Sequence, residues 1–300
     1  MRVTLFGTRG SVPAPGPDTA HFGGNTPSVE VRGEDGTVLV LDAGTGIRRL
    51  GAQLPPDLAR IDVLLTHLHM DHIQGLGFFG PLYRPDVEVH IWGPASSTMS
   101  LEARLSRYLS PPLFPVHLRD LPNITCHEVP LPPFAIGSLR IETALVCHPN
   151  PTVGYRIEEQ GRTVAYLPDH EPALCLHDGE WLEPEWTSGY ALAAGADLLI
   201  HDAQFTDQEY ARRAGWGHSA YRHAFEFAKR VGAKEAVLFH HDPSHDDNTL
   251  ERMLDDAVRL FKPTFRVSGG REGAVFELGA IDSAATRPAA RQLPLRRMAK

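Results

Sequence analysis

Short runs of apolar and β-branched residues, separated by segments rich in Gly and Pro, dominate the first half of the chain. Runs of this length and composition are typical of β-strands buried on at least one face. We therefore predict strands at residues 2–6, 28–32, 37–41, 61–65, 87–92, 124–129, 139–147, 153–158 and 163–167. Leu101, Leu105 and Tyr108 recur at helical spacing and predict a helix at about residues 97–108.

Strands and amphipathic helices alternate in the second half of the chain. Strands are predicted at residues 197–200 and 236–239, and helices at about residues 184–194 and from residue 219. A last helix starts near Asn248, and Pro263 ends it. A β-rich half followed by this alternation predicts an α/β fold, in which two mixed sheets pack face to face with helices outside.

Neither a repeat nor a linker divides residues 1–280, and we predict that they form a single domain. Three hundred residues is long for one domain but acceptable for a layered α/β unit. From about residue 281 the sequence changes to Ala, Pro and Arg. This composition predicts a basic C-terminal tail without fixed structure.

The formal charge of −8 is unevenly distributed. The last twenty residues contribute +4, which leaves −12 for residues 1–280. An acidic body argues against a broad nucleic-acid-binding surface, so we expect no stable complex with nucleic acid. A small anionic substrate remains compatible with this charge, because metal ions can supply positive charge locally.

The first residues of the chain lack the apolar length of a signal peptide. No stretch approaches the roughly 20 apolar residues of a membrane span. We therefore expect a cytoplasmic protein without membrane contacts. The cysteines Cys126, Cys147 and Cys175 are odd in number and lack CxxC spacing, which predicts buried free thiols.

A cluster of metal-ligating residue types follows the predicted strand at residues 61–65. Residues 66–72 read Thr-His-Leu-His-Met-Asp-His, so His67, His69, Asp71 and His72 lie in one turn at a strand end. Neutral imidazole and carboxylate are first choices for Zn²⁺ and also suit Mn²⁺ or Fe²⁺. Four such side chains within six positions predict a metal site.

Two adjacent metals need further ligands, including a bridging carboxylate. Candidates should lie at strand ends on the same rim as His67. His148 follows the predicted strand at residues 139–147, and Asp169 follows the strand at residues 163–167. Either His240 or His241 follows the strand at residues 236–239.

The motif at residues 67–72 resembles the HxHxDH signature of the metallo-β-lactamase superfamily. Within that superfamily the chain looks most like the branch of RNase Z and the small cyclic phosphodiesterases. Residues 5–11 and 24–28 resemble its opening "LGTGS … RNTSS", and residues 41–44 resemble its "DCGEG" turn. The resemblance implies the αββα sandwich of that superfamily.

The resemblance also implies a ligand set for two divalent metal ions, with zinc as the first choice and manganese as an alternative. One metal would take His67, His69, His148 and Asp169. The other would take Asp71, His72, Asp169 and His240, with His241 in reserve. Asp42, in the "DCGEG"-like turn, would orient groups of the metal site.

A second pair of motifs resembles that branch outside the ligand set. Ile-His-Asp-Ala at residues 200–203 is similar to "HEAT", and Gly-His-Ser-Ala at residues 217–220 is similar to "GHST". By this resemblance Asp202 orients His218, which serves as a proton donor. The alternative is that His218 merely lies near a helix start capped by Ser219.

These features together predict a dinuclear hydrolase of small phosphodiesters, with cyclic nucleotides or related cyclic phosphates as substrates. A hydroxide between the metals would attack phosphorus, with Asp71 in the catalytic centre and His218 as general acid. RNase Z enzymes carry a tRNA-gripping arm between the third ligand and the bridging Asp, for which residues 149–168 leave no room. A small anionic substrate is therefore expected as the partner. Separately, we expect a homo-oligomer, with a dimer as the first choice.

Two alternative functions remain open, and so does the role of one loop. A lactone or thioester hydrolase would keep the metals but cleave another bond. A non-catalytic member of the fold would keep the site for binding alone. The Pro-rich segment at residues 110–115, with an exposed Phe114, is either a surface connection or a wall of the substrate pocket.

Overall fold

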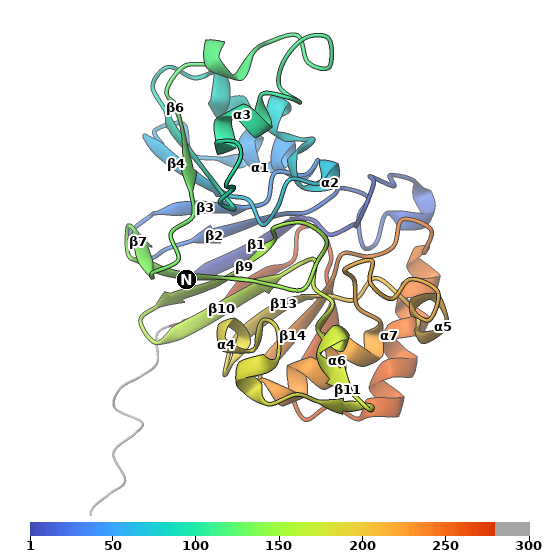
Figure 1. Ribbon diagram of the computed structural model, residues 1–300. Helices are drawn as coiled ribbons and strands as arrows, with labels where there is room; N and C mark the ends of the chain where they lie inside the picture. Colours follow the sequence, from blue (N-terminus) through green and yellow to red (C-terminus); the bar gives the residue numbers. More distant parts are fainter. Residues whose placement is uncertain (280–300) are drawn as a thin grey trace, which may run out of the picture.

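Two seven-stranded β-sheets stack face to face in the computed structural model, which describes residues 1–279 (Figure 1). Helices cover the outer face of each sheet, so the layers run helix, sheet, sheet, helix. This arrangement confirms the predicted α/β sandwich of two mixed sheets. The predicted basic tail, residues 281–300, lies outside the described residues.

The first sheet has the strand order β16–β1–β2–β3–β4–β5–β6. Its strands are β1 (Arg2–Gly7), β2 (Ser28–Arg32), β3 (Val38–Leu41), β4 (Arg60–Leu64), β5 (Glu88–Gly93), β6 (Ile124–Glu128) and β16 (Val275–Glu277). Pairing is antiparallel from β16 to β3 and parallel from β3 to β6.

The second sheet has the order β15–β14–β13–β10–β9–β8–β7. Its strands are β7 (Phe134–Ile136), β8 (Leu139–Leu145), β9 (Val153–Glu159), β10 (Arg162–Leu167), β13 (Leu198–Asp202), β14 (Glu235–Phe239) and β15 (Arg266–Gly269). The strands from β10 to β15 are parallel, and the others are antiparallel. A separate hairpin contains β11 (Leu176–His177) and β12 (Glu180–Trp181).

Alternation of side chains along each strand divides the core into layers. On β4 and just after it, Ile61, Val63 and Leu65 pack toward the helices, whereas Leu64 packs into the layer between the sheets. Tyr155 and Tyr166 of the second sheet also lie fully buried in that central layer. Because successive residues point to opposite faces, each strand serves two cores at once.

The helices lie in two groups. Beside the first sheet are α1 (Ile47–Gln53), α2 (Met70–Ile73) and α3 (Leu101–Leu105), and beside the second are α4 (Tyr190–Ala193), α5 (Asp207–Tyr210), α6 (Tyr221–Arg230) and α7 (Asp247–Phe261). Short 3₁₀ helices are η1 (Pro17–Thr19), η2 (Leu76–Phe78), η3 (Gly80–Tyr83), η4 (Leu118–Asp120), η5 (Pro172–Cys175) and η6 (Pro184–Trp186). Among the described residues, no helix is long and apolar enough to cross a membrane.

Two predicted helices are shorter than their sequence patterns indicated. The helix expected at residues 97–108 begins at Leu101, because the Ser100 hydroxyl accepts a hydrogen bond from the Ala103 N–H. The helix expected at residues 184–194 is divided into η6 and α4. Gly189 separates the two with a φ of 71°, a left-handed conformation that glycine adopts without strain.

The segment at residues 110–115 differs from its prediction. Phe114 is only 7% exposed and packs in the core between the first sheet and its helices, so its predicted exposure is wrong. Its ring meets Phe78 edge to face, and Leu109 belongs to the same core cluster. The neighbouring Leu113 is instead 70% exposed. A single sequence cannot tell which of two adjacent apolar residues points inward.

Candidate metal centre

Polar side chains from both sheets meet at one rim of the sandwich. The turn after β4 supplies His67, His69, Asp71 and His72, and the segments after β8, β10 and β14 supply His148, Asp169 and His240. The carboxyl ends of the parallel strands β4, β10, β13 and β14 all lead into this rim. The structure thus brings together all seven residues that the sequence proposed as metal ligands.

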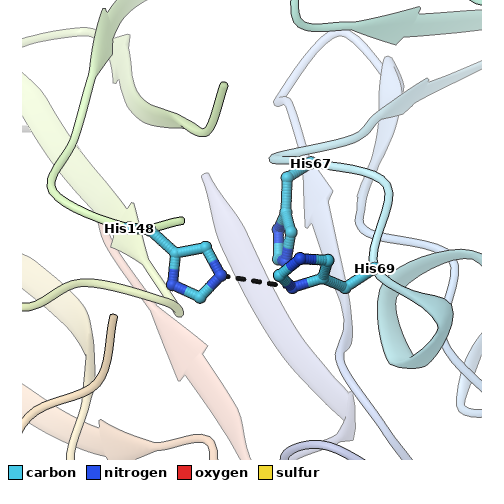
Figure 2. A group of neighbouring side chains, drawn as sticks. All are labelled: His67, His69 and His148. Atoms are coloured by element: carbon cyan, nitrogen blue, oxygen red, sulfur yellow. Dashed lines mark hydrogen bonds between the residues drawn. The ribbon is translucent and has the colours of Figure 1, made fainter. Parts of the chain in front are cut away.

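Three histidines form one end of the cluster (Figure 2). His67 and His69 come from the turn after β4, and His148 faces them from the opposite side. The His148 Nε2 and His69 Nδ1 atoms are 3.2 Å apart. One nitrogen from each of the three rings lies within 4.8 Å of the others, a spacing that suits a shared cation.

Asp71, His72 and His240 form the other end. The Nε2 of His240 lies 3.1 Å from the Asp71 Oδ2, and the Nε2 of His72 lies 3.4 Å from the same oxygen. His241 points elsewhere, because its Nε2 donates to the Gly270 carbonyl at 2.9 Å. Of the two candidate histidines, only His240 therefore lies in the cluster.

Asp169 lies between the two ends and offers one oxygen to each. Its Oδ1 is 2.9 Å from the His72 Nε2 and 3.4 Å from the His240 Nε2. Its Oδ2 is 3.8 Å from the Nε2 atoms of both His67 and His148. This is the geometry that a bridging carboxylate requires.

Hydrogen bonds from outside the cluster fix the ring orientations. The Nδ1–H of His148 donates to the Gly217 carbonyl at 2.9 Å, and the Nδ1–H of His72 donates to the Asp42 Oδ2 at 2.8 Å. The Nδ1 of His67 lies 3.0 Å from the Thr66 hydroxyl. With Nδ1 occupied in this way, each ring turns its Nε2 lone pair toward the cluster.

Asp42 has further partners that explain its place in the motif. Its carboxylate accepts from the Thr66 N–H at 2.7 Å and from the Tyr166 hydroxyl at 2.9 Å.

The backbone of Asp42 has a φ of 59°, and His240 has a φ of 61°. Left-handed conformations of non-glycine residues cost energy and concentrate at functional sites. The backbone is therefore strained at the two residues whose side chains are positioned at the site.

The N-terminal loop closes one side of the centre. The Ser11 N–H donates to the Asp71 Oδ2 at 2.7 Å. A Cβ atom on Gly10 would lie 2.4 Å from the His240 Nδ1, so this position has no room for a side chain. The glycine of the opening motif is thus explained by close approach of the backbone to a ligand candidate.

The protonation states of most cluster residues suit metal binding. Burial lowers the pKa of His67 well below its usual value and also lowers the pKa of His148. Burial alone would raise the pKa of Asp169, but the imidazoles of His240, His72 and His67 hold it well below its usual value. Metal ligands must be neutral imidazoles and ionised carboxylates. Within residues 1–279 the buried His67 Nε2 has no hydrogen-bond partner, so the residues fit a bound cation.

His72 is the exception among these imidazoles. Burial would lower its pKa, but the carboxylates of Asp169, Asp42 and Asp71 raise it well above its usual value. Carboxylates that stabilise a proton here would equally stabilise a metal ion in its place.

His218 and Asp202 form a pair at the edge of the cluster. The His218 Nδ1 lies 2.7 Å from the Asp202 Oδ2, and the His218 ring stacks on His240 with centroids 4.9 Å apart. The Asp202 Oδ1 accepts from the backbone N–H of Ser219 and of Gln204. These bonds hold the carboxylate, which in turn orients the imidazole. Burial lowers the pKa of His218.

Ser219 does not cap the following helix with its side chain. Its hydroxyl donates to the His170 carbonyl at 2.7 Å, and α6 begins two residues later at Tyr221. The alternative of a helix capped by Ser219 therefore does not describe this loop. Ser219 instead ties the His218 loop to the segment that carries Asp169.

Glu171 is a buried residue near the site that sequence reasoning missed. Its carboxylate accepts from the Tyr210 hydroxyl at 2.8 Å and from the N–H groups of Gly215 and Gly217 at 2.7 Å each. Gly217 in turn holds His148, and His218 follows directly. The partners lie about 40 residues away in sequence, so only its position two residues after Asp169 could have indicated this role.

We expect Glu171→Gln to lower kcat roughly 10- to 100-fold, as changes in residues that support metal ligands do. The amide would place an N–H₂ group against one of the backbone N–H donors and loosen the loop of Gly217 and His218. Steady-state kinetics on a substrate that the wild-type protein hydrolyses would measure the effect. The matched control is Glu180→Gln in the exposed hairpin, and equal kcat values for the two variants would contradict the role of Glu171.

Comparison with known families identifies the group to which this architecture belongs. A family profile described as "Beta-lactamase superfamily domain" matches residues 37–241, which is more than half of the chain and includes all seven residues of the cluster. The chain belongs to the β-lactamase superfamily. This result confirms the resemblance read from the sequence and the expectation of a metal-dependent hydrolase. The superfamily binds divalent metals, which agrees with the His and Asp cluster.

Individual relatives refine the comparison. The chain is 28% identical to a protein of Haloarcula marismortui named Ribonuclease Z, over 87% of this chain and 92% of the relative. The fold resembles the short form of human tRNase Z, with 22% identity, a TM-score of 0.63 and coverage of 93% and 100%. It also resembles a diphosphatase of the PhnP family, with 17% identity, a TM-score of 0.66 and coverage of 93% and 98%.

The predicted restriction to a small anionic substrate, without a nucleic-acid complex, is wrong. The curated relatives that match nearly the whole chain are named Ribonuclease Z. The size and fold of this chain therefore do not exclude RNA as a substrate. Net charge misled the prediction, because it averages over a surface and does not describe the surroundings of one site.

Proposed function

We propose that this protein is a phosphodiesterase that holds two divalent metal ions at the rim of the sandwich. His67, His69, His148 and Asp169 would hold one ion, and Asp71, His72, Asp169 and His240 the other. The support for two ions is the position of Asp169, whose two oxygens face the two groups of side chains separately. Imidazole and carboxylate donors favour zinc, with manganese as the alternative.

The observation that carries phosphodiester chemistry is the His218–Asp202 pair beside the cluster. When bound, two metal ions activate water as a nucleophile at neutral pH and offset charge on the phosphate oxygens. An alkoxide that leaves phosphorus needs a proton, which a positioned imidazole can donate. Asp202 holds the Nδ1 of His218, so the Nε2 is the atom that would deliver the proton to the leaving oxygen. Lactone and thioester cleavage need this help less.

RNA is the substrate class that the relatives favour. Between His148 and Asp169 the chain is filled by β9 and β10, so residues 149–168 contain no additional RNA-binding arm. Contacts to RNA beyond the scissile phosphate must therefore come from other elements around the metal centre.

A substrate panel on metal-reconstituted protein tests this proposal. The panel contains an RNA with a 3′ extension, a cyclic nucleotide, bis(p-nitrophenyl) phosphate, a lactone and a thioester. We expect hydrolysis of RNA and of bis(p-nitrophenyl) phosphate, with little turnover of the acyl substrates. Efficient turnover of the lactone or thioester, without cleavage of any phosphodiester, would contradict the proposal. Cleavage of the cyclic nucleotide alone would support phosphodiester chemistry and exclude RNA as the substrate.

A further inference from the structure

A cavity of about 610 Å³ lies beside the metal-binding turn. Leu68, Met70 and Ile73 line one wall, and these residues alternate with the ligand candidates of the same turn. The turn therefore serves two surfaces, with imidazoles toward the metals and apolar side chains toward the cavity.

The opposite wall comes from α3 and the segment after it. Arg104, Arg107 and Tyr108 share one face because residues three and four positions apart are neighbours on a helical turn. Leu101 and Leu105 occupy another face and pack into the core. Two guanidinium groups thus line a single cavity in a chain whose residues 1–280 carry a net charge of −12.

The two arginines differ in their partners. Arg104 is half-buried, donates to the Pro94 carbonyl at 2.5 Å and lies 3.9 Å from Glu128. Arg107 is exposed, and it forms no ion pair within residues 1–279. Tyr108 is fixed by its hydroxyl, which donates to the Gln74 carbonyl at 2.5 Å. The cavity therefore combines an anchored wall with one guanidinium that remains available for an anion.

Exposed apolar surface completes the wall. Met70 is 51% exposed and Leu113 is 70% exposed, and both line the cavity. Apolar side chains gathered beside a polar centre indicate a binding surface. Apolar side chains and the Tyr108 ring next to a guanidinium suit a nucleobase and its phosphate. Bases stack on aromatic side chains and on arginine, and arginine pairs with phosphate.

We propose that this cavity is a nucleotide subsite, which binds the nucleotide next to the scissile phosphate of an RNA substrate. Arg107 contacts the phosphate of that nucleotide, and Met70, Tyr108 and Leu113 form the surface for its base. The proposal rests on the phosphodiesterase function proposed above. It assigns RNA contacts to α3 and to the segment at residues 110–115, in place of an arm between the ligands.

Kinetics of Arg107→Ala on two substrates tests the subsite. We expect the KM for an RNA oligonucleotide to rise about tenfold, which corresponds to loss of one hydrogen bond to a charged group. The kcat/KM for bis(p-nitrophenyl) phosphate, which has no nucleotide to place in the cavity, should be unchanged. The matched control is Arg119→Ala, an exposed arginine on η4 that does not line the cavity.

A second variant keeps the test independent of Arg107. Leu113→Glu places a negative charge in the same wall at an exposed position, and we expect it to raise the KM for RNA by a similar factor. If wild-type protein hydrolyses no phosphodiester, the proposed function fails. If wild-type protein cleaves RNA but Arg107→Ala and Leu113→Glu have the KM of Arg119→Ala, the subsite is wrong and the proposed function stands.

Discussion

Asp169→Ala is expected to lose most of the bound metal and nearly all hydrolytic activity. Asp169 faces both groups of ligand candidates. Its removal would take one oxygen ligand from each metal ion and leave the histidines of the two groups without the carboxylate between them. Loss of supporting residues alone costs 10- to 100-fold in metal affinity. Loss of a ligand shared by both ions should therefore cost at least about 100-fold.

Elemental analysis of purified protein would measure this effect directly. Wild-type protein should hold about two metal ions per chain, the number that a dinuclear site requires. Asp178→Ala, in the exposed turn of the β11–β12 hairpin, is the matched control and should retain both ions. Full metal occupancy in Asp169→Ala would show that Asp169 is not a bridging ligand.

His218→Ala should lower the rate of hydrolysis by an amount that depends on the leaving group of the substrate. A general acid is typically worth 10²- to 10⁴-fold when the leaving group needs a proton, and little when it does not. RNA releases an alkoxide and should lose activity by about this factor. Bis(p-nitrophenyl) phosphate releases a phenolate that needs no proton, and it should lose much less.

The metal content of the His218→Ala variant must be measured together with these rates. The His218 Nδ1 lies 3.9 Å from the Asp169 Oδ2, so a role as an additional ligand is the competing explanation. If His218 is the acid, His218→Ala retains its metal, and Asp202→Ala shows the same substrate pattern more mildly. Equal losses on both substrates together with loss of metal would instead make His218 a ligand.

The fold and the ligand candidates could be predicted because both follow from local patterns. Strand ends are visible as apolar runs followed by polar residues, and parallel strands bring such ends to a common rim. His67, His148, Asp169 and His240 each follow a predicted strand, and the structure places them together. Short edge strands such as β7 and β16 escaped prediction, because three residues carry too little pattern.

Features that depend on contacts distant in sequence could not be predicted. Nothing around Glu171 indicates that its carboxylate receives the N–H groups of Gly215 and Gly217. The burial of Phe114 and the exposure of Leu113 depend on how one turn after α3 packs. The exclusion of RNA failed for a related reason, because net charge does not reveal that Arg104 and Arg107 share a cavity beside the metal-binding turn.

Titration of metal-free protein with zinc, followed by the rate of RNA hydrolysis, tests the central claim most directly. A dinuclear phosphodiesterase should gain activity until about two equivalents of metal per chain are bound. Manganese should be tested in parallel, since the same donors accept it. We expect a plateau near two equivalents with RNA as substrate. A plateau at one equivalent, or RNA hydrolysis that does not depend on added metal, would contradict it.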